Sequence, residues 1–174
     1  MANSVSWFDH WQPDQQLDSA AQLQPEALRA RGIRGIIFDL DSTLAPWGFT
    51  RPPPGLPGFL DRLEHQGFSL AFLSNHSGWG REGLRESLGG RPLIFGARKP
   101  RPTGFLRLLE LMGLPARQVA VVGDQLFTDI WGAKRLGLWA ILVPSLALAA
   151  EPWPMRPRRL LERVVLRLLD RFCP

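Results

Sequence analysis

The feature that most constrains this chain is a regular alternation between short apolar runs and amphipathic helical patterns. Parallel strands need a crossover connection, usually a helix, between one strand and the next. The alternation therefore predicts an α/β fold, a Rossmann-like parallel sheet of about five strands with helices on both faces. The expected strands are Ile33–Phe38, Phe68–Leu73, Pro92–Phe95, Val119–Val122 and Trp139–Val143.

Helical patterns fill the connections between these runs, and several of them stop at a glycine, as helices commonly do. The expected helices are Leu23–Arg31, Leu56–Gln66, Trp79–Leu88, Pro102–Met112, Phe127–Leu136 and Arg156–Phe172. We interpret residues 1–174 as a single domain, with residues 1–31 as an N-terminal extension and residues 156–172 as an amphipathic C-terminal helix. The connections are too short to hold a second large domain.

The net charge of +5 favours an anionic partner, such as a phosphorylated substrate, an acidic membrane or nucleic acid. The basic residues are arginines except for Lys99 and Lys134. A lysine kept in such a chain suggests that a compact ammonium group is required there.

The chain shows no sign of a membrane span or a secretory signal. Its longest apolar stretch, residues 136–150, contains glycine, proline and serine and is shorter than the ~20 residues that span a bilayer. Its first residues lack the basic stretch and apolar core of a signal peptide, and the single Cys173 excludes an internal disulfide. These features predict a cytoplasmic protein without a transmembrane segment.

Polar side chains follow four of the expected strands at the points where the strands end. They are Asp39, Asp41 and Thr43 after the first strand, Ser74 and Asn75 after the second, Lys99 after the third, and Asp124 and Asp129 after the fourth. Open parallel sheets bind ligands beyond the carboxyl ends of their strands, so these groups are expected to share one site. Carboxylates suit Mg²⁺, whereas lysine and serine suit phosphate oxygens. Asp39 and Asp41 would point to the same side of a strand, but an ordinary turn also explains this pair.

These residues resemble the motifs of the haloacid dehalogenase (HAD) superfamily. "DLDST" is similar to its first motif, Ser74 to its second, Lys99 to its third and "GDQLFTD" to its acidic fourth. The phrases "FDLDSTLAPW" and "VGDQLFTDIWGAKRLG" are more closely similar to the YqeG-like type IIIA phosphatases, which look related to the phosphatidylglycerophosphate phosphatases. His76 and "GAKR" depart from the usual subfamily pattern, which bears on the substrate and not on the four motifs.

The resemblance implies a Mg²⁺-dependent phosphatase without a large cap domain, which works through an aspartyl-phosphate. Asp39 would be the nucleophile and Asp41 the general acid and base. The implied catalytic residues are Asp39, Asp41, Ser74 and Lys99; the implied substrate-binding residues are Thr43, Ser74, Asn75 and Lys99; and the implied metal ligands are Asp39, Asp41, Asp124 and Asp129. Asp41 would bind the metal through its backbone carbonyl, and Asp129 would orient Lys99 or a metal-bound water. An alternative for Asp129 is an acid that interacts with a helix dipole.

Several readings of the substrate and the partner stay open. The resemblance favours phosphatidylglycerophosphate; the alternatives are a soluble phosphate, a phosphoprotein or a nucleic-acid end, with nucleic acid the less expected partner. A non-catalytic metal- or phosphate-binding module is a second alternative, and a receiver-type domain would need its acceptor acid after a later strand. Arg159, Arg163, Arg167 and Arg171 could bring the terminal helix to an anionic membrane as a peripheral contact, or could form a solvated edge of a packed helix.

Overall fold

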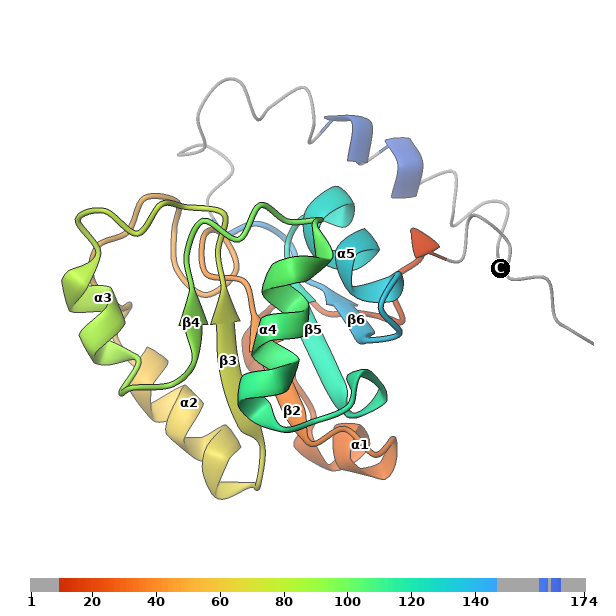
Figure 1. Cartoon of the computed structure of the whole chain (residues 1–174), viewed down its shortest axis with the longest axis horizontal. Helices are drawn as coiled ribbons and strands as arrows, with labels where there is room; N and C mark the ends of the chain where they lie inside the picture. The colour runs from red at the N-terminus through yellow and green to blue at the C-terminus, as the bar shows by residue number, and fades with distance from the viewer. Residues whose placement is uncertain (1–9, 147–159, 163, 167–174) are drawn as a thin grey trace, which may run out of the picture.

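The structure is a computed structural model that describes residues 10–146, 160–162 and 164–166. In that part of the chain, six parallel strands form one sheet in the order β1-β6-β5-β2-β3-β4 (Figure 1). The strands are β1 (Gln15–Gln16), β2 (Gly35–Phe38), β3 (Ser69–Leu73), β4 (Leu93–Ile94), β5 (Val119–Gly123) and β6 (Trp139–Leu142). The predicted parallel α/β architecture is confirmed.

The edge strand β1 is the one strand that the sequence pattern did not predict. Backbone hydrogen bonds hold it beside β6, from Asp14 N to Ala140 O at 2.9 Å and from Leu17 N to Leu142 O at 3.0 Å. The Lys134 ammonium also pairs with Asp14 at 2.6 Å. Because two glutamines form no apolar run, periodicity could not reveal a strand that rests on backbone bonds and one ion pair.

Five α-helices connect the strands in the described residues. They are α1 (Pro25–Ala30), α2 (Leu56–His65), α3 (Glu82–Ser87), α4 (Pro102–Met112) and α5 (Trp131–Lys134). Short 3-10 turns lie at Ala20–Gln22 and Ala116–Gln118. The helix predicted from Trp79 begins later, at Glu82, because Gly78 and Gly80 adopt φ values of 83° and 72° and keep this segment in a loop.

The predicted helix Phe127–Leu136 is a π-helical turn, η4 (Leu126–Ile130), followed directly by α5. The amide of Ile130 donates to the carbonyl of Gln125 at 3.3 Å, which is the five-residue spacing of a π-turn. The Asp129 carboxylate accepts the Gln125 amide at 3.1 Å, so this side chain folds back over the start of the turn. Single π-turns of this kind often occur at functional sites.

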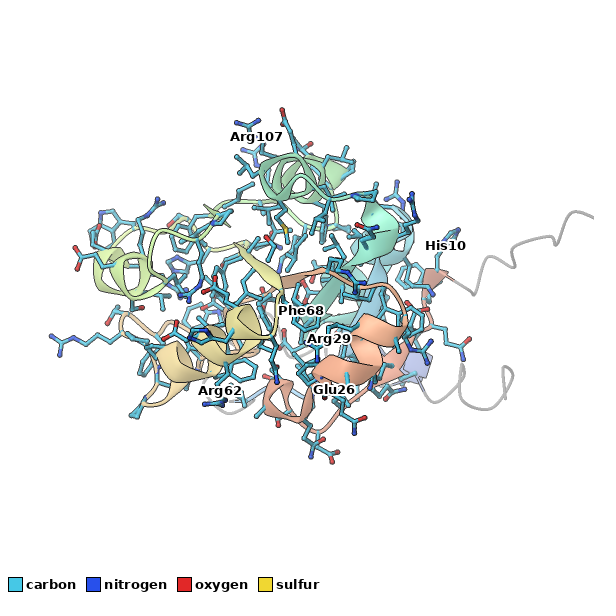
Figure 2. All side chains as sticks on the ribbon, turned by 90° about the horizontal axis from the view of Figure 1, so that it is seen from below. His10, Glu26, Arg29, Arg62, Phe68 and Arg107 are labelled. Atoms are coloured by element: carbon cyan, nitrogen blue, oxygen red, sulfur yellow. The ribbon has the colours of Figure 1, made fainter. Side chains whose placement is uncertain are left out.

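Alternate residues of the central strands pack against opposite layers of helices. Ile36 and Phe38 join the leucines of α1, α2 and α3 in one buried cluster. Ile37 of the same strand joins Phe105 of α4 and Ile130 in the other cluster. Figure 2 shows this layering: Arg107 on α4 lies on one side of the sheet, and Arg62 on α2 and Glu26 on α1 lie on the other.

The connections that lead to the site are short. Between β2 and β3 the chain forms loops and α2, and between β3 and β4 it forms loops and α3, so neither connection holds a separate cap domain. No helix within residues 10–146, 160–162 and 164–166 has the length and apolar character needed to cross a bilayer.

The predicted terminal helix is described only in part. Residues 160–162 and 164–166 are helical, as expected. The rest of the predicted range, with Arg159, Arg163, Arg167 and Arg171, lies outside the described residues. The contact of these arginines with lipid stays a prediction, as does the division of the chain into one domain with two terminal extensions.

Candidate active site

The loops that follow the strands bring the predicted polar residues to one end of the sheet, the upper end in Figure 1. A cavity of about 250 Å³ opens there between these loops. Its lining includes Asp39, Asp41, Ser74, Asn75 and Lys99, together with Trp47, His76, Gln125 and Thr128. Residues that lie far apart in the sequence therefore share one pocket, as the strand-end argument predicts.

Lys99 lies at the centre of a buried ion-pair network. Its Nζ is 2.5 Å from Asp39 Oδ1 and 2.6 Å from Asp129 Oδ1. Burial lowers the pKa of Lys99, but the charges of Asp129 and Asp39 outweigh burial and hold this pKa above its usual value. The lysine is therefore a permanent cation between two acids.

Asp39 is almost fully buried, with 6% of its surface exposed. Burial raises the pKa of Asp39 to about 7, against the lowering effect of Lys99, and the nearby charge of Asp129 adds to the rise. The Thr43 hydroxyl donates to Asp39 Oδ2 at 2.9 Å and lies 3.3 Å from Asp124 Oδ1. Thr43, predicted to bind substrate, thus contacts the acids directly and links the β2 loop to the β5 loop.

Asp39, Asp124 and Asp129 form a cluster of three buried carboxylates. One ligand oxygen from each lies within 4.8 Å of those of the other two. The cluster has three carboxylates and one neighbouring ammonium group, so when all three acids are ionised it carries an excess of negative charge that suits a divalent cation. The predicted metal ligands Asp39, Asp124 and Asp129 are thus brought together, whereas the carboxylate of Asp41 is not part of this cluster.

Gly123 makes the position of Asp129 possible. A Cβ added to Gly123 would lie 2.5 Å from both Cβ and Cγ of Asp129, which is far inside van der Waals contact. Glycine at the end of β5 therefore leaves the space that the π-turn needs to bring Asp129 to Lys99.

Asp41 is paired with a different cation, the guanidinium of Arg81. Arg81 donates to Asp41 Oδ1 at 2.5 Å and to Oδ2 at 2.9 Å, and its own exposed fraction is 2%. Burial raises the pKa of Asp41, but the hydrogen bonds and the charge of Arg81 outweigh burial and bring this pKa below its usual value.

The two acids of "DLDST" therefore face the same cavity but not one common cation. The strand ends at Phe38, and Ser42 adopts the left-handed region with φ of 66°, so the alternation of an extended strand does not continue through this loop. Asp39 pairs with Lys99 on one side, and Asp41 pairs with Arg81 on the other. Arg81 was not predicted, because one arginine in an arginine-rich chain carries no signal of its own.

Ser74 and Asn75 shape the wall of the cavity. The Ser74 hydroxyl donates to Asp41 Oδ2 at 3.0 Å and accepts the His76 amide at 3.1 Å. The Asn75 side chain exchanges two hydrogen bonds with the backbone of Lys99, from Lys99 N at 2.6 Å and to Lys99 O at 3.2 Å. Asn75 thus fastens the loop that presents the lysine.

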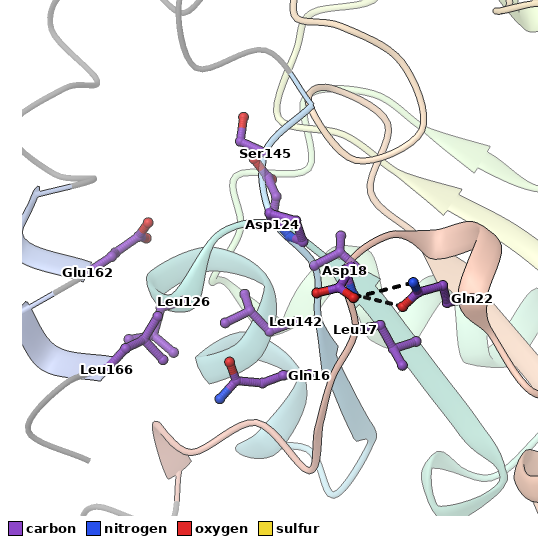
Figure 3. Close-up of a pocket in the computed structure, with 12 residues that line it drawn as sticks. Gln16, Leu17, Asp18, Gln22, Asp124, Leu126, Leu142, Ser145, Glu162 and Leu166 are labelled. Carbon is purple, nitrogen blue, oxygen red and sulfur yellow. Dashed lines mark hydrogen bonds between the residues drawn. The ribbon is translucent and has the colours of Figure 1, made fainter. Parts of the chain in front are cut away.

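A larger cavity of about 440 Å³ adjoins Asp124 (Figure 3). Its apolar lining includes Leu17, Leu126, Leu142 and Leu166, and its polar lining includes Asp18, Gln22 and Glu162. The Glu162 carboxylate accepts the amide of Phe127 at 3.2 Å, which ties the described part of the terminal segment to the π-turn. The carboxylate cluster thus lies between two hollows.

Comparison with known proteins gives a consistent set of matches. A family model described as HAD-hydrolase-like matches residues 96–161. The probable phosphatase YqeG of Bacillus subtilis is 34% identical over 159 residues, which cover 91% of each chain. The phosphatidylglycerophosphate phosphatase 1 of Arabidopsis thaliana is 30% identical over 82% of this chain, which spans 43% of that plant protein.

Solved structures match the fold at lower identity. The D,D-heptose 1,7-bisphosphate phosphatase of B. bronchiseptica, complexed with magnesium and phosphate, gives a TM-score of 0.53 at 19% identity, over 80% of this chain and 99% of that one. The cobalt-bound deoxy-D-mannose-octulosonate 8-phosphate phosphatase of Haemophilus influenzae gives 0.52 at 16% identity, over 79% and 89%. At these identities, the likeness concerns the fold alone.

Proposed function

Because this chain belongs to the HAD family of phosphatases, we propose that it hydrolyses phosphomonoesters with Mg²⁺ and through a phosphorylated Asp39. The observation that carries the proposal is the position of Asp39, buried against Lys99 and Asp129, with Asp41 across the same cavity.

The proposed reaction has two steps. In the first, an Asp39 carboxylate oxygen forms a bond to phosphorus, and the bond from phosphorus to the leaving oxygen breaks. Asp41 donates a proton to that oxygen, which requires that Asp41 give up its ion pair with Arg81 and take up a proton before this step. In the second, Asp41 takes a proton from a water molecule, whose oxygen attacks phosphorus and releases Asp39 and inorganic phosphate. Lys99 and the Ser74 hydroxyl would contact the phosphoryl oxygens during both steps.

The three buried carboxylates Asp39, Asp124 and Asp129 fit a divalent cation and would hold Mg²⁺. When bound, the ion would neutralise the negative charge of the phosphoryl oxygens and the acids. Asp129 would divide its two oxygens between the lysine on one side and the Gln125 amide on the other.

EDTA is expected to stop turnover until Mg²⁺ is restored.

Mg²⁺ is also expected to stabilise the protein. At a 100-fold excess of Mg²⁺ over its Kd, the Tm should rise by about 5–10 °C. Burial raises the pKa of Asp39 to about 7, so at pH 6 the ion must displace a proton, and the rise should be larger at pH 8. Asp124→Asn should lose the rise, whereas Asp61→Asn on the surface should keep it; an unchanged shift in Asp124→Asn would contradict the site.

We further propose a lipid phosphate, phosphatidylglycerophosphate, as the preferred substrate. The names of two relatives, the phosphatidylglycerophosphate phosphatases of Arabidopsis thaliana and Chlamydomonas reinhardtii, support this choice, as do the short connections that leave the site uncapped. The cavity beside Asp124 adds support, because its leucines offer apolar surface to the part of a substrate beyond its phosphate (Figure 3).

The substrate proposal is tested with phosphate release from phosphatidylglycerophosphate in mixed micelles, beside glucose 6-phosphate and a nucleotide monophosphate. The lipid should show a kcat/KM at least about tenfold higher, because its remote atoms add binding energy that a small sugar lacks. Faster turnover of a water-soluble phosphate would remove the lipid assignment and leave the phosphatase assignment in place.

A further inference from the structure

A basic hollow lies on the outer side of the loop that carries Lys99. It has a volume of about 360 Å³ and lies between the end of β4 and the first turns of α4. Arg98, Arg101 and Arg107 line it, together with Thr103, and all three arginines are exposed. Lys99 points into the catalytic cavity, so adjacent residues of one loop serve two separate hollows.

Among the described residues, two of these guanidinium groups have no acid that neutralises them. Arg107 pairs with Glu110 at 2.5 Å, whereas Arg98 and Arg101 form no ion pair with any residue of the described part of the chain. Arginine is well suited to phosphate oxygens, because its planar group donates two parallel hydrogen bonds. Uncompensated guanidinium groups around one hollow therefore favour a phosphate-bearing partner.

Trp79 exposes a large apolar side chain on the neighbouring loop, the one that follows β3. Its side chain is 87% exposed, in contrast to Trp11, which stacks on Trp131 at a centroid distance of 4.9 Å. The two loops are held together: the Gly96 amide donates to the His76 carbonyl at 2.7 Å, and Asn75 is bonded to Lys99 at both backbone positions. The loops that carry Trp79 and the arginine hollow are therefore joined, and the same two loops supply Asn75, His76 and Lys99 to the lining of the catalytic cavity.

We propose that Trp79, Arg98, Arg101 and Arg107, here named the rim surface, dock this protein on an anionic lipid bilayer. Arginines near the headgroups of anionic lipids are attracted to them, and tryptophan side chains favour the boundary between headgroups and acyl chains. An inorganic polyanion would match the arginines but not the exposed indole, whereas a single-stranded nucleic acid can stack a base on it and is therefore one outcome of the test. The inference rests on the proposed lipid substrate, because docking at this face would bring headgroup phosphates to the mouth that holds Lys99 and Asp39.

The test is sedimentation of the full chain with vesicles of phosphatidylglycerol and phosphatidylcholine, compared with pure phosphatidylcholine, at low and high salt. Arg98→Gln with Arg101→Gln should weaken binding to the anionic vesicles about 25-fold, since each arginine contributes roughly fivefold. The matched control is Arg62→Gln with Arg117→Gln, which removes the same charge at the opposite end of the sheet, where the strands begin; Arg62 lies on the side viewed in Figure 2. This control should bind like the wild type.

Trp79→Ala should also weaken binding to the anionic vesicles, whereas Leu111→Ala should not, although Leu111 is a half-exposed apolar residue of α4. Each variant should keep the Tm of the wild type, which excludes loss of folding as the cause. The proposal is overturned if the wild type ignores anionic vesicles at low salt, or if both double variants lose binding equally. It is also overturned if only a single-stranded oligonucleotide binds the rim surface. Wild-type hydrolysis of 4-nitrophenyl phosphate without vesicles reports on the phosphatase separately.

Discussion

Asp39→Asn is expected to abolish phosphate release, by at least about 10⁴-fold, while the protein stays folded. The amide has the shape of the carboxylate, so it can keep the Thr43 contact, but it cannot form the bond to phosphorus that the first step requires. The measurement is steady-state phosphate release at saturating Mg²⁺. Tm and circular dichroism should confirm the fold.

Asp61→Asn is the matched control for this change. Asp61 forms an exposed ion pair with Arg91 at 2.7 Å, far from the cavity, so its amide variant should keep full activity. An Asp39→Asn protein that still turns over substrate, with its identity confirmed by intact mass, would exclude Asp39 as the nucleophile.

Lys99→Arg is expected to lose about 10²–10³-fold in kcat. The Lys99 side chain is 3% exposed and fills the space between Asp39 and Asp129, where a guanidinium group is too wide and too planar to fit. Lys134→Arg, the matched exchange of the other lysine, should stay within about twofold, because a partly exposed pair with Asp14 tolerates the larger group. Equal rates for the two variants would show that the compact ammonium of Lys99 is not needed.

Much of the fold could be predicted because the central strands are apolar runs with clear ends. Strands β2, β3, β5 and β6 pack on both faces, so their sequences are nearly continuous in buried residues, and α4 begins at Pro102 and stops before Gly113 as its pattern indicates. The rule that ligands meet at the carboxyl ends of parallel strands then placed the acids, the serine and the lysine in one cavity.

The features that were not predicted depend on contacts between distant segments. Strand β1 consists of two glutamines held by the backbone of β6, and no period in the sequence marks it. The π-turn that delivers Asp129 arises from one extra residue in a helical pattern, which does not change the types of residue involved. Arg81 follows Asp41 by forty positions, and only the folded chain shows that these two side chains meet.

The close approach of Gly123 to Asp129 bears on how inactive relatives of this protein would be recognised. A relative could keep every acid, the serine and the lysine of the four motifs, and a search for those residues would count it as an enzyme. Any side chain at position 123 would nevertheless collide with Asp129 and push its carboxylate away from Lys99. Gly123, which has no reactive side chain, thus decides whether the motif residues around it form a working active site or are merely inherited without activity.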